Sequence, residues 1–200
     1  EKTTINDIIR KLDVSKGAFY HYFSSKEDVI TAVTSEYVQR MIALMNSIVE
    51  RTDQSALKRL NTLLVEVNLA KKQQEEKRSV LKGIFDGEKN LKLEKRIGDA
   101  IYREAIKVFQ DIIRQGVEDG SFSVKDADET AEFTFHTIAT LNRSVDALVR
   151  THRSGAISRE VFTDRLERKL DLHEAVLNGL FHPRQGAICL KEAYWKRCVL

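Results

Sequence analysis

Two helix starts lie only ten residues apart near the beginning of the chain, and this spacing constrains the fold more than any other feature. Ser15 and Ser25 are both of the residue type that accepts a hydrogen bond from the first turn of a helix. Asp28 follows Ser25 by three residues, as in a capping box. The helix between these two starts is therefore only about two turns long. Phe19 and Phe23, at i and i+4, are expected to share its buried side.

The residues before this short helix predict another one. Apolar residues recur at the i, i+3, i+4 and i+7 positions of an amphipathic helix that follows a threonine cap, namely Ile5, Ile8, Ile9 and Leu12. Only a tight turn at 13–14 separates the two helices. A short helix, a three- or four-residue turn and a second short helix form a helix-turn-helix, whose second helix enters the major groove of DNA.

Two stretches of this region resemble a known family. Residues 3–8 read Thr-Thr-Ile-x-Asp-Ile, and residues 14–28 read Val-Ser-Lys-Gly-x-Phe-Tyr-His-Tyr-Phe-x-Ser-Lys-Glu-Asp. This pattern is similar to the DNA-binding signature of the TetR family of bacterial transcriptional regulators. The resemblance implies DNA contacts at Thr4, Ser15, Lys16, Gly17, Ala18, Tyr20, His21 and Lys26.

The chain departs from the family pattern in two respects. Asp13 stands where the family usually has Gly, and Ile9 and Leu12 stand where it usually has Ala. Asp tolerates the left-handed backbone conformation better than most residues, so we expect the turn to be kept. The family also has a further helix before the Thr-Thr cap. That first helix is missing here, so we expect the natural protein to be longer.

The charge distribution favours a local nucleic-acid surface. The net charge of the whole chain is only +3, which does not by itself indicate nucleic acid. Basic residues are nevertheless concentrated in the leading segment, at Lys2, Arg10, Lys11, Lys16 and Lys26. No apolar run approaches the length of a membrane span, so we expect a cytoplasmic protein with no membrane partner.

Helical periodicity continues through the rest of the chain and predicts an all-α fold. A long helix from residue 25 to about 48 leaves the first unit, and a short helix is expected to end at Asp86-Gly87. Residues 116–122 form a second resemblance to the family, where a long helix closes in a Gly-x-x-x-Gly-x-Phe turn. We predict a helix-turn-helix domain over 1–46 and a larger helical effector-binding and dimerisation domain over 47–182. The tail, 183–200, matches no family feature and is an extension or a cloning remnant.

The last two helices before the tail, at roughly 128–150 and 158–181, carry wide apolar stripes. In TetR-like proteins this pair forms a four-helix bundle with its two-fold mate. The resemblance therefore implies a homodimer. The predicted interface residues are Leu148, Phe162, Leu166, Leu170, His173 and Leu177.

We found no catalytic pattern in the sequence. It has no Gly-rich phosphate loop, no Gly-x-Ser-x-Gly and no Cys-x-x-Cys, so we expect neither an enzyme nor a metal or other cofactor. His136 has two readings: a core histidine bonded to a neighbour, or a polar group that orients a ligand in an effector pocket. The predicted pocket lining for a small, largely apolar effector is Tyr102, Phe109, Phe133, His136 and Asn142.

Two functions remain open from the sequence. The first is a dimeric, ligand-responsive bacterial transcriptional regulator, a repressor, that binds a palindromic operator through the helix at 16–22. The second is a helical ligand-binding or dimer-forming module that has lost operator binding. Dependence of binding on DNA sequence separates the two.

Overall fold

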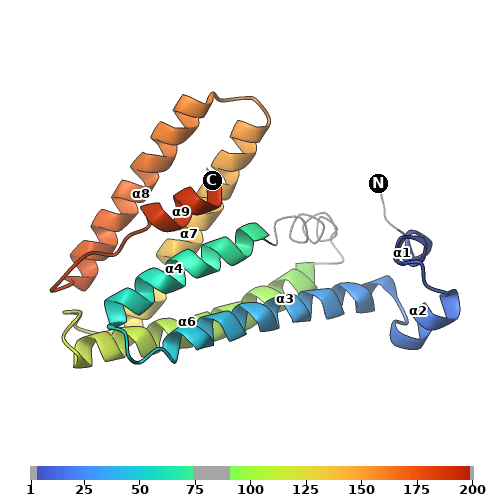
Figure 1. Ribbon diagram of the computed structural model, residues 1–200, viewed down its shortest axis with the longest axis horizontal. Coiled ribbons are helices and arrows are strands. Elements are labelled where there is room, and N and C mark those ends of the chain that lie inside the picture. Colours follow the sequence, from blue (N-terminus) through green and yellow to red (C-terminus); the bar gives the residue numbers. More distant parts are fainter. Residues whose placement is uncertain (1–3, 74–90, 199–200) are drawn as a thin grey trace.

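The computed structural model describes residues 4–73 and 91–198, and within these ranges the chain is entirely helical and without strands. The short helix predicted to end at Asp86-Gly87 lies outside the described residues. Figure 1 shows two small helices at the far end of one long helix, and a bundle of longer helices around its other end. The predicted all-α fold is confirmed.

The small unit is a helix-turn-helix made of α1 (Ile5–Leu12) and α2 (Lys16–Tyr22). Asp13 makes the turn with φ 52° and ψ 43°, and its N–H donates to the carbonyls of Arg10 and Ile9. The left-handed conformation expected at Asp13 is thus present, and it satisfies carbonyls that the end of α1 leaves open.

Helix α3 (Lys26–Val49) connects this unit to the bundle. Ser25 accepts a hydrogen bond from the N–H of Asp28 at 3.1 Å, and the Asp28 carboxylate accepts one from the N–H of Ser24 at 3.0 Å. Both capping bonds fix where α3 begins, directly after the helix-turn-helix. The C-terminal half of α3 enters the core of the bundle, where Met45 and Ile48 are buried.

The bundle contains α4 (Ala56–Gln73), α6 (Leu91–Glu118), α7 (Ala127–Arg153) and α8 (Arg159–Phe181). Helix α6 packs against both α3 and α7, and α7 packs against α8. One continuous apolar core joins these helices, with fully buried side chains that include Leu60, Ile112, Leu141, Leu166 and Leu170.

The turn that closes α6 depends on the close approach of the Phe122 ring to the backbone of Gly116. The N–H of Phe122 donates to the carbonyl of Gly116 at 2.8 Å, and Gly120 has φ 74°. A Cβ on Gly116 would lie 2.0 Å from the Phe122 ring, so only glycine fits there. The Phe122 ring in turn meets Phe181 edge to face at 4.9 Å, which anchors the turn to the end of α8.

The tail is part of the same core. After Pro183 the chain turns back and forms α9 (Lys191–Cys198), which packs on α4 and α8. Ile188, Leu190 and Tyr194 are at most 1% exposed. The Glu174 carboxylate accepts hydrogen bonds from the N–H groups of Leu190 and Lys191, at 2.6 and 2.8 Å, where α9 begins. A carboxylate in this position both satisfies open donors and complements the helix dipole.

Candidate nucleic-acid interface and ligand cavity

Helix α2 buries one side chain, Phe19, and exposes its other six residues. Phe19 is 3% exposed, and its ring lies 5.7 Å from that of Phe23, as the i, i+4 spacing predicted. The Ser15 hydroxyl accepts a hydrogen bond from the N–H of Ala18 at 3.1 Å, which confirms the predicted cap. The exposed residues of this helix are Lys16, Gly17, Ala18, Tyr20, His21 and Tyr22.

Two further predicted DNA contacts lie at neighbouring helix starts. Thr4 caps α1 through a reciprocal pair of hydrogen bonds with Asp7, at 3.2 Å to the Thr4 hydroxyl and 2.9 Å from the Thr4 N–H. The Thr4 hydroxyl also donates to the Asp7 carboxylate, and these bonds lower the pKa of Asp7. Lys26 is the first residue of α3. Thr4, Ser15 and Lys26 thus lie at the beginnings of three consecutive helices, where backbone N–H groups favour anions, whereas Tyr20 and His21 lie toward the end of α2.

Tyr22 was not among the predicted contacts, yet it is 77% exposed, and its ring meets that of His21 at 5.0 Å. A tyrosine at the end of a two-turn helix gives no sign in the sequence of which side it occupies. Its exposure adds a second exposed tyrosine to α2, on a different side of the helix from Tyr20 because the two are at i and i+2.

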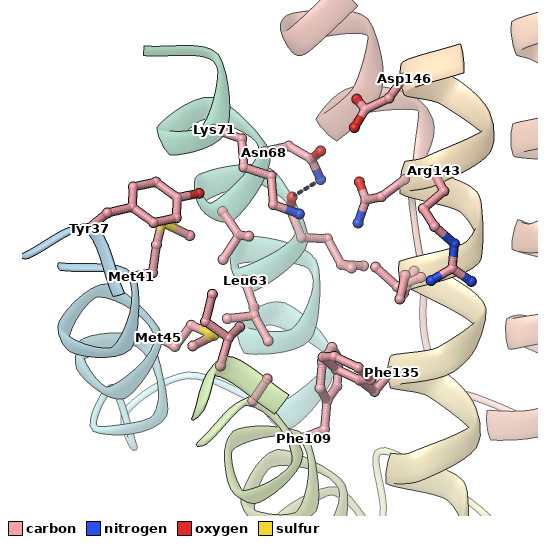
Figure 2. A pocket seen from close by; sticks show the side chains of 17 residues that line it. Tyr37, Met41, Met45, Leu63, Asn68, Lys71, Phe109, Phe135, Arg143 and Asp146 are labelled. Atoms are coloured by element: carbon pink, nitrogen blue, oxygen red, sulfur yellow. Dashed lines mark hydrogen bonds between the residues drawn. The ribbon is translucent and has the colours of Figure 1, made fainter. Parts of the chain in front are cut away.

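A cavity of about 330 Å³ lies inside the bundle, between α3, α4, α6 and α7. Figure 2 shows that Met45, Phe109 and Phe135 surround one end, while Asn68, Lys71 and Asp146 gather at the other and the Arg143 guanidinium turns away from them. Asn142 also lines the cavity, and the other lining residues are Tyr37, Met41, Leu63, Leu64, Val67, Ile101, Ala105, Ile138 and Ala139. A mostly apolar wall with a few convergent polar groups is typical of a small-molecule site.

The structure brings only two of the five predicted effector residues, Phe109 and Asn142, into this lining. The assignment is corrected for Tyr102, Phe133 and His136. Tyr102 does not line the cavity, and its ring meets that of Phe135, which does, edge to face with the ring centroids 5.1 Å apart. Phe133 is 49% exposed, and His136 is also exposed. The reason is helical phase, because the face of α7 that lines the cavity carries residues 135, 138, 139 and 142.

A buried guanidinium from α9 reaches the polar end of the cavity. Arg197 Nη1 donates to Asn68 Oδ1 at 3.2 Å and to Asn142 Oδ1 at 3.0 Å, and Nη2 pairs with the Asp146 carboxylate. The side chain of Arg197 is only 6% exposed. Tyr194, whose pKa is raised by burial, donates its hydroxyl proton to Asn142 Oδ1 at 3.0 Å. The tail residues were not predicted to belong to a site, because α9 is short and its apolar residues are interrupted by charges.

The predicted dimer residues of α7 and α8 lie mostly inside one chain. Leu148, Phe162, Leu166, Leu170 and Leu177 are each at most 7% exposed. His173 is half-buried, and its Nδ1 lies 2.7 Å from the Lys169 carbonyl oxygen. The five buried side chains have no surface to offer a second copy, so the interface assignment is corrected for them. The large apolar side chains that α8 exposes are Val161, Leu172 and Val176.

None of the described helices has the length and apolar character needed to cross a membrane.

Comparisons with known proteins agree with the helix-turn-helix. The sequence profile described as "Bacterial regulatory proteins, tetR family" matches residues 1–33. The fold is similar to that of the crystal structure of a transcriptional regulator from Cytophaga hutchinsonii, with a TM-score of 0.61 and 18% identity. That similarity covers 90% of this chain and 89% of the other. No curated protein sequence matches the chain.

Proposed function

Because the chain belongs to the TetR family of bacterial regulatory proteins, we propose that it is a ligand-responsive repressor that binds operator DNA as a dimer. The observation that carries the proposal is α2, whose exposed side chains and capped N-terminus stand at the free end of α3. A gel-shift against DNA upstream of neighbouring genes, at moderate salt, tests it. Binding that is independent of DNA sequence would instead favour a ligand-binding module without an operator.

In this proposal α2 reads the major groove. Lys16 and Tyr20 contact base edges or nearby phosphates, and Thr4, Ser15, His21 and Lys26 lie against phosphates on either side. Such a protein acts in the bacterial cytoplasm, where its operator is.

Replacing Tyr20 or Lys16 by alanine is expected to weaken operator binding while leaving the fold intact, because both side chains are exposed. A lost base contact costs about 1–3 kcal/mol and relaxes preference at one base pair, whereas a lost phosphate contact lowers the salt slope by about 1. Gel-shift titrations at several salt concentrations separate the two cases. Lys125→Ala, an exposed lysine in the α6–α7 turn, is the matched control. Unchanged operator binding by Tyr20→Ala would mean that α2 is oriented differently.

We place the two-fold interface on the exposed side of the α7–α8 pair, with Leu172 and Val176 at its centre. Leu172 is 63% exposed and Val176 is 41% exposed, and they are neighbours at i and i+4 on α8. A dimer of this kind would set two reading helices about 34–36 Å apart, one turn of the duplex, so the operator would be an imperfect palindrome.

Leu172→Glu is expected to give monomers that keep their helical content but lose operator affinity, since the new carboxylates would face each other across the two-fold axis. Sedimentation velocity at micromolar concentration, followed by a gel-shift, measures both effects. The control is Glu167→Gln, which removes a charge from an exposed position on the same helix. A wild-type protein that sediments as a monomer would contradict the whole dimer scheme.

We propose that the cavity is the effector site. Tyr37, Met41 and Met45 line it from α3, the same helix that begins at the reading unit. A ligand that fits one tilt of α3 better than another shifts the spacing of the two reading helices. A coupling of about 1–3 kcal/mol would change operator affinity roughly 5- to 150-fold.

A further inference from the structure

The orientation of one amide in the cavity wall is fixed by the tail. Asn142 Oδ1 lies 3.0 Å from Tyr194 Oη and 3.0 Å from Arg197 Nη1. A guanidinium can only donate, so the atom that meets it must be the amide oxygen and not the nitrogen. The hydrogen-bond network therefore determines which way Asn142 points.

This orientation leaves a donor at the cavity. Asn142 is a lining residue, and its Nδ2 makes no hydrogen bond to any residue that the structure describes. Asn68, on the opposite wall, is oriented in the same way, with Oδ1 accepting from Arg197 and Nδ2 donating to the Leu64 carbonyl at 2.8 Å. Both oxygens are thus directed to Arg197, and the amide nitrogen of Asn142 is left for a ligand.

The charges at the polar end of the cavity also favour a ligand that accepts hydrogen bonds. Asp146 is the acidic lining residue, and its carboxylate is paired with the buried Arg197 guanidinium. Lys71 brings a cationic side chain to the same end, as Figure 2 shows, whereas the exposed Arg143 donates to the Thr140 hydroxyl at 3.0 Å. Since Arg197 offsets the negative charge of Asp146, the end as a whole is positive and rich in donors, and it favours an anionic acceptor.

The rest of the cavity is apolar. Met41, Met45, Phe109 and Phe135 line it away from the polar end. Its volume of about 330 Å³ is at the small end of the range for ligand pockets, so a short chain fits better than a membrane lipid. Methionine side chains adapt readily to a flexible aliphatic chain.

We propose that the effector is a short amphipathic carboxylate whose head group accepts a hydrogen bond from Asn142 Nδ2, and that α9 sets this preference by holding Asn142 and Asp146 through Arg197. The inference rests on the proposed function only in taking the cavity as the effector site. The tail is then part of the ligand-recognition site, although none of its residues lines the cavity itself.

The test uses three probes with the same chain and different heads: decanoate, decan-1-ol and decylamine. Calorimetric titration of the full chain, below the micelle concentration of each probe, is expected to show decanoate binding at least about tenfold tighter than decylamine, with decanol between them. The decisive variant is Asn142→Asp. Its carboxylate still accepts from Tyr194 and Arg197, but the group facing the ligand changes from a donor to an anionic acceptor.

Asn142→Asp is expected to weaken decanoate binding by about tenfold or more and to leave decanol nearly unchanged. Asn46→Asp, which adds the same charge at an exposed position of α3 outside the cavity lining, should leave all three affinities unchanged. Equal affinities for the three heads, a preference for decylamine, or no binding of any probe would overturn the proposal. A gel-shift with the ligand-free protein is run in parallel, because sequence-specific DNA binding would survive each of those results and is the separate test of the proposed function.

Discussion

Leu170→Ala is expected to lower the free energy of unfolding by about 2–5 kcal/mol, because it opens a cavity in a filled core. Leu170 is 0% exposed on α8 and belongs to the apolar core shared with α7. Leu172, two residues further along the same helix, is 63% exposed and supplies the matched control. Leu172→Ala should change the stability of the subunit by no more than about 0.5 kcal/mol. Urea unfolding followed by circular dichroism measures both variants.

Unfolding should be repeated at several protein concentrations, because dissociation of a dimer contributes to apparent stability. In the proposed dimer, Leu172→Ala would lower the urea midpoint of unfolding mainly at low protein concentration, whereas Leu170→Ala lowers it at every protein concentration. Equal losses of stability for the two leucines, independent of concentration, would contradict the assignment of a buried and an exposed face to α8.

Arg197→Met is expected to destabilise the protein by about 3–5 kcal/mol, since it leaves a charge without its partner in a largely enclosed place. Asp146 would lose its guanidinium, and the oxygens of Asn68 and Asn142 would lose a donor. Lys196→Met is the control, because the Lys196 side chain is 42% exposed and pairs with Glu192 on the surface. Thermal unfolding of both variants at neutral pH gives the comparison.

A second substitution separates loss of the ion pair from loss of packing. Arg197→Met combined with Asp146→Leu removes both charges and should recover most of the lost stability, since an apolar pair of similar volume replaces the buried ion pair. If the double variant is no more stable than Arg197→Met alone, the contribution of Arg197 comes from packing and not from its charge.

The sequence predicted the helix-turn-helix well because its signals are local. Ser15 and Ser25 cap helices that begin where predicted, and Asp13 adopts the left-handed conformation expected of it. The long helix predicted over 25–48 is α3, Lys26–Val49. Cap chemistry and apolar spacing depend on a few adjacent residues, so a single sequence suffices to read them.

The cavity and the subunit interface depended on tertiary contacts that spacing alone does not contain. An apolar stripe on α8 has the same period whether it faces its own chain or a second copy, and Leu166 and Leu170 face their own. The apolar periodicity of α3 does not show that Met41 and Met45 line a cavity, since a side chain beside a cavity has the same pattern as one in a filled core. The role of Arg197 depends on pairs more than fifty residues apart in the sequence, such as Arg197 with Asp146.

The continuity of α3 has a consequence for how ligands are selected. Met41 lies about 22 Å along the helix from Lys26, so a change in tilt of about 5° at the cavity moves the start of α3 by about 2 Å. By thermodynamic reciprocity, an operator that holds two reading helices at a fixed spacing also restricts the tilt at Met41 and Met45. Under the proposed function, DNA would thus act as an effector of the cavity: each operator sequence would alter which ligands the protein binds well, and two promoters under the same regulator would respond to one compound at different concentrations.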